Sequence, residues 1–305
     1  MKNKTSIFLL CLLIVSLASS GISYGQSEEA SATGFDSTRN FLGQSNVETY
    51  AGQILYVLPQ PEIFRDHGYE GFKEYVDYKK FIGHTGDVDV AWKHYGRAAK
   101  SKPCNTLYED LEGKCFIVDS VEVVRDMFYR KLYFFALTNR DDTDDKCYFI
   151  YNKYYDFAFP FLVVSHRNYL VKKHVGTAYV LSNDGKYGVW KGKDIVVSDE
   201  GDVQIGLVSS TGKIYRKEQE FSFSSVGQNI FERSQWDEFV GQYGREYMIC
   251  VLNRNVKVGM PELLLAYSLG FPRKINEDPY GLQQYVYEYM YVYVKNGKVS
   301  SWQKF

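Results

Sequence analysis

Short apolar runs, each bounded by Gly, Pro, Asp or Asn, dominate the chain from about residue 50 to residue 170. Their residues are largely β-branched or aromatic, and such residues favour extended chain on a pleated, half-buried surface. The pattern predicts antiparallel strands that close a small β-barrel over 47–170, with a long insertion of mixed pattern at about 64–104. The runs are GQILYVLP, GKCFIVDSVEVV, RKLYFFALTN, KCYFIYNKYY and FPFLVVSHRNYL.

A second series of short runs covers 171–225, and it predicts a second small β-barrel. Its opening echoes the first series, because Gly52 leads into the run Leu-Tyr-Val-Leu and Gly176 leads into Tyr-Val-Leu, one residue out of step. The spacing of both series resembles that of SH3-like barrels in secreted bacterial proteins over about 52–223. The resemblance rests on pattern and not on a diagnostic motif.

Beyond the second series, apolar positions recur every three or four residues, the period of an amphipathic helix. Ser234 and Asp237 are placed to cap the first turn of this helix. A second helix fits Pro261 to Leu269, where Gly270 can close the helix and Pro272 prevents its continuation. The first apolar stripe consists of Trp236, Phe239, Val240, Tyr243 and Tyr247.

Three strands are expected in the last stretch, QQYVYEYMYVYVKNGKVSSWQKF, with a type I′ turn at Asn296-Gly297. If alternation is unbroken, a Val/Met face packs on the helices and a row of tyrosines faces outward. Such a row is a candidate interaction face for a peptide or a glycan, and the alternative is that cross-strand aromatic pairs simply stabilise the sheet. The tyrosines are Tyr285, Tyr287, Tyr289, Tyr291 and Tyr293.

The segment 234–305 resembles the BamE-like (SmpA/OmlA) family. The motifs that carry the resemblance are Val256-x-Val258-Gly259-Met260, Leu269-Gly270-x-Pro272, Gln284-Tyr285-Val286-Tyr287 and the run YVYVKNGKV that begins at Tyr291. The resemblance implies a domain, placed at 226–305, in which two helices pack on a three-stranded antiparallel sheet and serve protein contacts rather than catalysis. Pro261 and Tyr285 depart from the usual Ser/Thr and Trp of that pattern. The family's role in outer-membrane assembly is not implied, because the chain lacks a lipobox and carries the module as a tail.

The first residues, 1–25, have the features of a secretory signal peptide: Lys2 and Lys4, an apolar run, and small residues at Ser23 and Gly25. The run is shorter than the roughly 20 apolar residues of a membrane span. A polar spacer is expected at 26–46, and no other segment is apolar enough to cross a bilayer. The net charge of −1 lacks the basic excess that phosphate-backbone binding needs, so nucleic acid is a poor partner.

Four cysteines remain after signal removal, an even number that predicts disulfides in an oxidising compartment. Their three pairings cannot be ranked from sequence, and buried free thiols are the alternative. A cysteine nucleophile paired with His166 or His174 has no local signature to support it. The candidate disulfide cysteines are Cys104, Cys115, Cys147 and Cys250.

Two sets of residues, one of His and Asp and one of Asp alone, are candidate metal ligands. The first is His84, Asp87, Asp89 and His94, whose spacing matches no ligand template. The second is the run Asp141-Asp142-x-Asp144-Asp145, which lacks the glycine and the distal glutamate of a calcium-binding loop and is better read as an acidic hairpin tip. No cofactor motif is present, so no metal or cofactor is expected.

Together these patterns predict an α+β protein with a β-rich N-terminal part. We expect an exported, non-enzymatic envelope protein, periplasmic or extracellular, that acts by contacts with another envelope protein. The alternative is a cell-wall or glycan-directed hydrolase, or an accessory binding protein, with its site in the 64–104 insertion.

Overall fold

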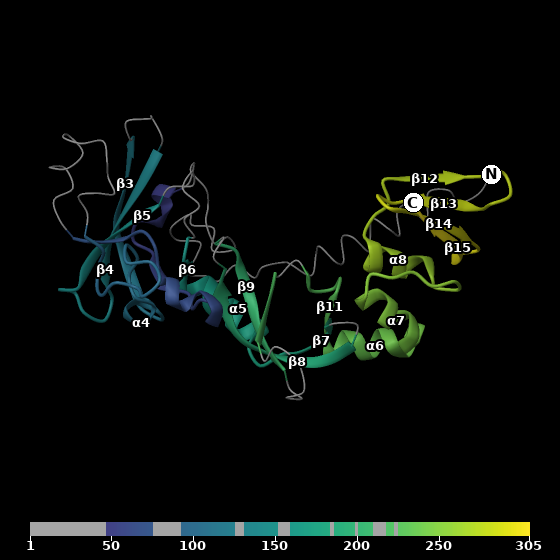
Figure 1. Ribbon diagram of the computed structural model, residues 1–305, viewed down its shortest axis with the longest axis horizontal. Helices are drawn as coiled ribbons and strands as arrows, with labels where there is room; N and C mark the ends of the chain where they lie inside the picture. Colours follow the sequence, from purple (N-terminus) through teal and green to yellow (C-terminus); the bar gives the residue numbers. More distant parts are fainter. Residues whose placement is uncertain are drawn as a thin grey trace. The chain divides into compact units, whose positions relative to one another are not determined.

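The chain divides into two compact units, which we describe separately: unit 1 is Met1–Lys173 with Ile195–Gln204, and unit 2 is His174–Asp194 with Ile205–Phe305. Figure 1 shows the elements of the computed structural model. The expected signal peptide at 1–25 and spacer at 26–46 lie outside the described residues. The structure describes 47–75, 93–125, 131–151, 159–183, 186–198, 201–209, 218–222 and 225–305.

Unit 1 contains a six-stranded sheet of order β2-β5-β4-β3-β1-β6, in which every neighbouring pair is antiparallel. Its elements are η2 (Val47–Tyr50), β1 (Ile54–Val57), η3 (Glu62–His67), β2 (Phe72–Glu74), α4 (Tyr108–Leu111), β3 (Cys115–Arg125), β4 (Lys131–Asn139), β5 (Lys146–Tyr151), β6 (Phe161–Val163) and α5 (Val164–His174).

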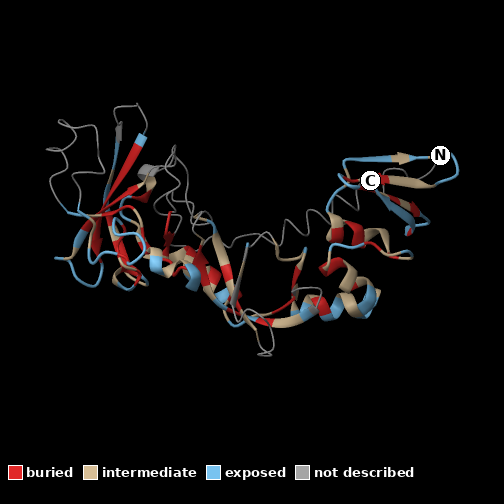
Figure 2. Ribbon diagram, viewed as in Figure 1, coloured by how far each residue is buried: buried red, intermediate tan, exposed pale blue. Residues whose placement is uncertain are grey.

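The core of unit 1 is largely aromatic. Phe149 lies at its centre, with its ring centroid 5.1 Å from that of Phe72 and 4.9 Å from that of Phe161. Strand β4 is buried on both faces, because Tyr133 and Phe135 join this cluster while the intervening side chains join a second one. Burial on both faces explains why the sequence of β4 reads as a continuous apolar run instead of alternating. Figure 2 shows the buried positions in red.

A second sheet has the order β10-β9-β8-β7-β11, and β7 alternates between two cores. Tyr179 faces a cluster with Trp190, while its neighbour Val180 faces another cluster with Phe231 and Trp236. These strands are β7 (Ala178–Asn183), β8 (Lys186–Val197), β9 (Val203–Ser209), β10 (Glu218–Ser222) and β11 (Ile230–Glu232).

The last part of unit 2 consists of three helices and a four-stranded antiparallel sheet of order β12-β13-β14-β15. The inner face of this sheet shares one core with the helices and with Val180 and Phe231, so the predicted boundary at 225/226 falls within one unit. The elements are α6 (Arg233–Tyr243), α7 (Arg245–Leu252), α8 (Glu262–Leu269), β12 (Lys274–Glu277), β13 (Gln283–Val286), β14 (Met290–Lys295) and β15 (Lys298–Lys304).

The predicted α+β class with antiparallel strands is confirmed. The closed barrels are not found, since each sheet formed by the described strands is open, with two edge strands. The turn at Asn296-Gly297 has the two positive φ angles that a type I′ turn requires, 52° and 71°. Within the described ranges no helix is both long and apolar enough to span a membrane.

Two local predictions about the helices were wrong. The first expected helix is two helices, because Gly244 adopts a φ of 92° between α6 and α7 and interrupts the turn. Ser234 and Asp237 do not cap it: α6 begins one residue earlier, at Arg233, and Asp237 instead accepts a 2.8 Å hydrogen bond from Arg233 Nε. The predicted second helix is present as α8, with Pro261 at its N-cap.

Candidate functional site: a pocket beside strand β15

The five tyrosines of the predicted interaction face do not share one face. Directly opposite residues in an antiparallel pair lie on the same side of a sheet, and Tyr285 lies opposite Val292. Odd-numbered residues of β13 therefore face the same way as even-numbered residues of β14. The prediction of a single outward row was wrong because the turn between these strands changes the parity.

The inner face contains Tyr285 and Tyr287, both buried together with Met290, Val292 and Val294. Tyr285 Oη donates a hydrogen bond to the Glu262 carboxylate of α8. Burial, and then the nearby Glu262 carboxylate, raise the pKa of Tyr287. These two tyrosines hold the sheet to the helices and cannot contact a ligand.

The outer face contains Tyr291 and Tyr293, both half-buried, while Tyr289 lies at the turn with 70% of its surface exposed. A row of hydrogen bonds crosses three strands here: Asn276 Nδ2 donates to Gln284 Oε1 at 2.9 Å, and Gln284 Nε2 donates to Tyr293 Oη at 3.2 Å. These two bonds are cross-strand pairs of the kind that stabilise a sheet.

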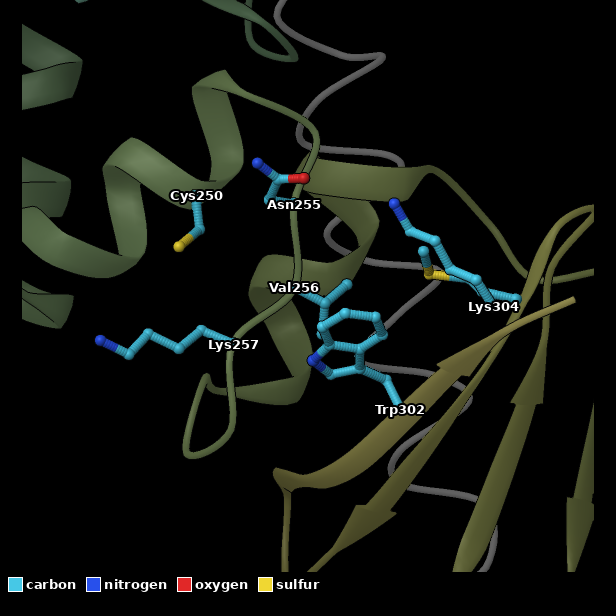
Figure 3. A pocket seen from close by; sticks show the side chains of 7 residues that line it. Cys250, Asn255, Val256, Lys257, Trp302 and Lys304 are labelled. Atoms are coloured by element: carbon cyan, nitrogen blue, oxygen red, sulfur yellow. The ribbon is translucent and has the colours of Figure 1, made fainter. Parts of the chain in front are cut away.

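A pocket of about 290 Å³ opens on the inner side of the sheet, between β15 and the loop that joins α7 to α8. This volume is at the small end of ligand sites, enough for one side chain or a small molecule. In Figure 3, Trp302 and Val256 are seen between Lys257 and Lys304. The pocket is lined by Cys250 of α7, by Asn255, Val256 and Lys257 of the loop, by Met290 of β14, and by Trp302 and Lys304 of β15.

The pocket keeps its form because the loop is held by backbone hydrogen bonds. Asn255 N donates to the Cys250 carbonyl at 2.8 Å, after Arg254 has adopted a positive φ of 52°. The buried Val256 side chain then turns into the core. At the other end of the loop, Gly259 N donates to the Val299 carbonyl at 2.8 Å, which attaches the loop to β15.

The pocket walls are apolar, and the rim is cationic. Burial raises the pKa of the Cys250 thiol, so the thiol stays protonated and acts as an apolar wall. Lys257 forms an exposed ion pair with Glu246, which raises the pKa of the lysine. Lys304 has no ion pair with any residue that the structure describes. The arrangement offers binding contacts and no activated nucleophile.

Trp302 is the aromatic group of this site. Its partner on β14, Val292, is fully buried, so the indole also points to the inner face. Because β15 is an edge strand, the helices do not cover the indole completely, and 42% of its surface is exposed. Sequence reasoning missed Trp302, because its inward direction and its place on an edge strand follow from the strand register and order and not from the residue types.

The acidic run at 141–145 forms no metal site in the structure. Asp145 turns inward and accepts hydrogen bonds from Tyr95 Oη at 2.6 Å, Asn139 Nδ2 at 2.9 Å and Lys114 Nζ at 3.1 Å. Burial acts to raise the pKa of Asp145, but these hydrogen bonds outweigh it and the pKa is lowered. Asp145 is therefore a charged anchor of unit 1 and not a member of an exposed acidic tip.

The other candidate metal ligands are not brought together by the described residues. His84, Asp87 and Asp89 lie outside the described ranges, and His94 forms a backbone bridge with Lys73. No group of three or more His, Cys, Asp or Glu side chains within those ranges is arranged to hold a metal ion.

The four cysteines are free thiols in the structure. Cys115 on β3 and Cys147 on β5 are separated by β4, so their Cα atoms are at least about 9 Å apart, too far for a disulfide. Pairings that involve Cys104 or Cys250 stay predictions from the sequence, whereas the structure has both as free thiols. Burial raises the pKa of the Cys115 and Cys147 thiols, which disfavours the thiolate of a nucleophile. His174 is one of the two histidines considered as the partner of a cysteine nucleophile. Its Nδ1 lies 2.6 Å from Tyr179 Oη.

Comparison with protein-family models, with curated proteins and with solved structures gives no significant match.

Proposed function

We propose that the protein is an exported, non-enzymatic component of the cell envelope that acts by binding another protein. The observation that carries this proposal is that Trp302, on the edge strand β15, is half-exposed and lines an apolar pocket. Export is supported by the signal-peptide features of residues 1–25.

An aromatic side chain beside an apolar pocket is typical of protein-binding sites. Tryptophan supplies a large, rigid contact area and dominates the binding energy of many interfaces. The neighbouring Lys257 and Lys304 offer polar contacts at the rim, where charged residues commonly surround an apolar centre. The protonated Cys250 thiol offers no nucleophile, so the pocket favours binding over catalysis.

We further propose that the C-terminal part of unit 2 is a BamE-like domain. The order of α7 and α8 followed by β13, β14 and β15 supports this proposal, with α6 and β12 as additional elements. A generic role in envelope protein contacts is what such a domain implies. This proposal concerns the C-terminal part alone. It does not require SH3-like barrels upstream, where the sheets formed by the described strands are open.

Site-specific photo-crosslinking of the full chain in its native envelope tests the proposal. A photoreactive phenylalanine analogue replaces Trp302 in one variant and Tyr280 in a matched control. Tyr280 is also aromatic and exposed (89%), but it lies in the turn after β12, away from the pocket. A discrete crosslinked protein is expected from position 302 and not from position 280. Equal crosslinking at both positions, or none at either, would contradict the proposal.

Point variants are better than truncation for this purpose. Removal of the chain after residue 223 would take away β11, which pairs with β7. It would also remove Phe231, which shares a core with Val180 of β7. A loss of binding by such a truncated chain would then report unfolding of unit 2 and not loss of a contact.

A further inference from the structure

We infer that the bound partner contributes an extended segment that adds to the free half of strand β15 and places one apolar side chain in the pocket. This inference rests on the proposed function and specifies its binding mode. Three features of the structure lead to it: the direction of the backbone groups of β15, the segment that already covers half of its edge, and the position of the pocket.

The backbone groups of Trp302 and Lys304 point away from the sheet. Phe305 N donates to the Tyr289 carbonyl, and Tyr291 lies opposite Gln303 in the same register. In an antiparallel pair every second residue forms the hydrogen bonds to its neighbour, and the residues between them direct their N–H and C=O groups to the other side. Residues 303 and 305 pair with Tyr291 and Tyr289, so residues 302 and 304 face the open edge.

The first half of this edge is already occupied by the chain itself. Val299 N donates to the Met260 carbonyl at 2.9 Å, and Glu262 N donates to the Gly297 carbonyl at 2.9 Å. Pro261 forms an antiparallel bridge with Lys298. The segment 259–262 therefore shows that β15 accepts an antiparallel neighbour at this edge.

Beyond Gly259 this intramolecular neighbour leaves the edge. The chain turns through the exposed Val258 to Lys257, which lines the pocket. An incoming antiparallel segment takes the place along Trp302 and Lys304 that the loop does not fill. Such strand addition supplies affinity through backbone hydrogen bonds and specificity through alternate side-chain pockets.

The side chain that enters the pocket follows from the register. A residue opposite Trp302 lies on the same face as the indole, which is the face of the pocket. Its neighbours there are Val256 and Met290, so an apolar side chain fits. In an antiparallel segment, the residue opposite Lys304 comes two positions earlier, on the same face, beside an unpaired ammonium group. The expected recognition sequence is Asp or Glu, then any residue, then an apolar residue.

Peptide selection tests this inference. A phage-displayed library of short linear peptides of random sequence is panned against the wild-type chain, and enriched peptides are then measured by fluorescence anisotropy. We expect the acidic-x-apolar pattern to be enriched. Trp302→Ala should weaken binding by about tenfold or more, because the anchor of the site is lost. Tyr280→Ala is the matched control and should bind like the wild type.

A second pair of variants separates the backbone contact from the charge. Lys304→Ala removes the side chain beyond Cβ together with its ammonium group, whereas Lys304→Pro also removes the backbone N–H that faces the edge. Proline is tolerated on the open side of an edge strand, since the ladder to β14 does not use this N–H. We expect Lys304→Pro to weaken peptide binding by about tenfold more than Lys304→Ala does. Equal affinities for these two variants would overturn strand addition.

Failure of the inference is distinguishable from failure of the proposed function. If no peptide is enriched while position 302 still crosslinks a protein, the partner is recognised as a folded surface and the added strand is wrong. If peptides bind but amide exchange of Trp302 and Lys304 is not slowed by them, the peptide lies elsewhere and the inference is also overturned.

Discussion

Ser268 Oγ donates a 2.8 Å hydrogen bond to the backbone carbonyl of Asn255. Ser268 is buried in the last turn of α8, and Asn255 lines the pocket. The bond ties the pocket loop to a helix that packs in the core, so the shape of the pocket depends on a residue that does not line it.

Replacement of Ser268 by Ala should therefore destabilise unit 2. The Asn255 carbonyl loses its hydrogen-bond donor, and leaving a partly buried acceptor unsatisfied lowers the free energy of unfolding by about 1–3 kcal/mol. Urea unfolding followed by tryptophan fluorescence measures the change. Ser301→Ala, on the exposed face of β15, is the control and should change stability by less than about 0.5 kcal/mol. Similar losses in both variants would contradict the role given to Ser268.

Gly259 is a second determinant of the loop. Its φ is +85°, and a Cβ at this position would lie 2.7 Å from Tyr247 Oη. Gly259→Ala should lower the free energy of unfolding by about 1–3 kcal/mol, from the positive φ and from displacement of the Tyr247 ring. Gly281→Ala is a matched control, because its φ is +78° with no atom within 4 Å of the added carbon. The difference between the two variants isolates the steric part, and no difference would show that Tyr247 yields freely.

Asp145 should make unit 1 sensitive to acid. Its folded-state pKa is lowered, so its contribution is present above the unfolded pKa of about 3.9 and is lost as the pH falls through the folded value. Asp145→Asn should lower stability at neutral pH by about 1–3 kcal/mol and flatten the decline in stability below about pH 4. Urea titrations across this range measure both effects. Asp144→Asn, at the exposed tip of the same hairpin, is the control, and an equal effect there would refute the anchor role.

The cysteines should differ in reactivity. Cys104 is exposed, whereas Cys147 is fully buried and burial raises its pKa. Iodoacetamide without reductant should label Cys104 in the native protein and Cys147 only after denaturation, since the thiolate is the reactive form. Intact-mass measurement counts the labels. A cysteine that stays unlabelled in denaturant until reductant is added is in a disulfide, which would contradict the free thiols.

Local features of the fold could be predicted from sequence because they depend on few residues. The turn at Asn296-Gly297 follows from the φ angles that these two residues tolerate, and α8 follows from Pro261 and Gly270 at its ends. The sides on which the tyrosines lie depended on the length of one turn, and a single change of parity moved Tyr285 and Tyr287 into the core. Closure of a sheet depends on contacts between distant strands, which the pattern of short runs does not contain.

The pocket could not be predicted for a similar reason. Cys250 and Val256 are about fifty residues before Trp302 in the sequence, and they meet it only because the segment 259–262 attaches the loop to β15. The residue types alone gave no sign of this meeting. The exposed position of Trp302 follows from the place of β15 at the edge of its sheet, which is a property of the whole domain.

The segment 259–262 also bears on the solubility of the protein. A long open strand edge lets copies of a chain pair with one another and stack into fibres. Since this segment covers Lys298 and Val299, a shorter part of β15 is free for repeated pairing of that kind, and Lys304 adds repulsion between identical copies. The same few residues therefore leave room on this edge for a short peptide and shorten the part of β15 that another copy of the chain could pair with.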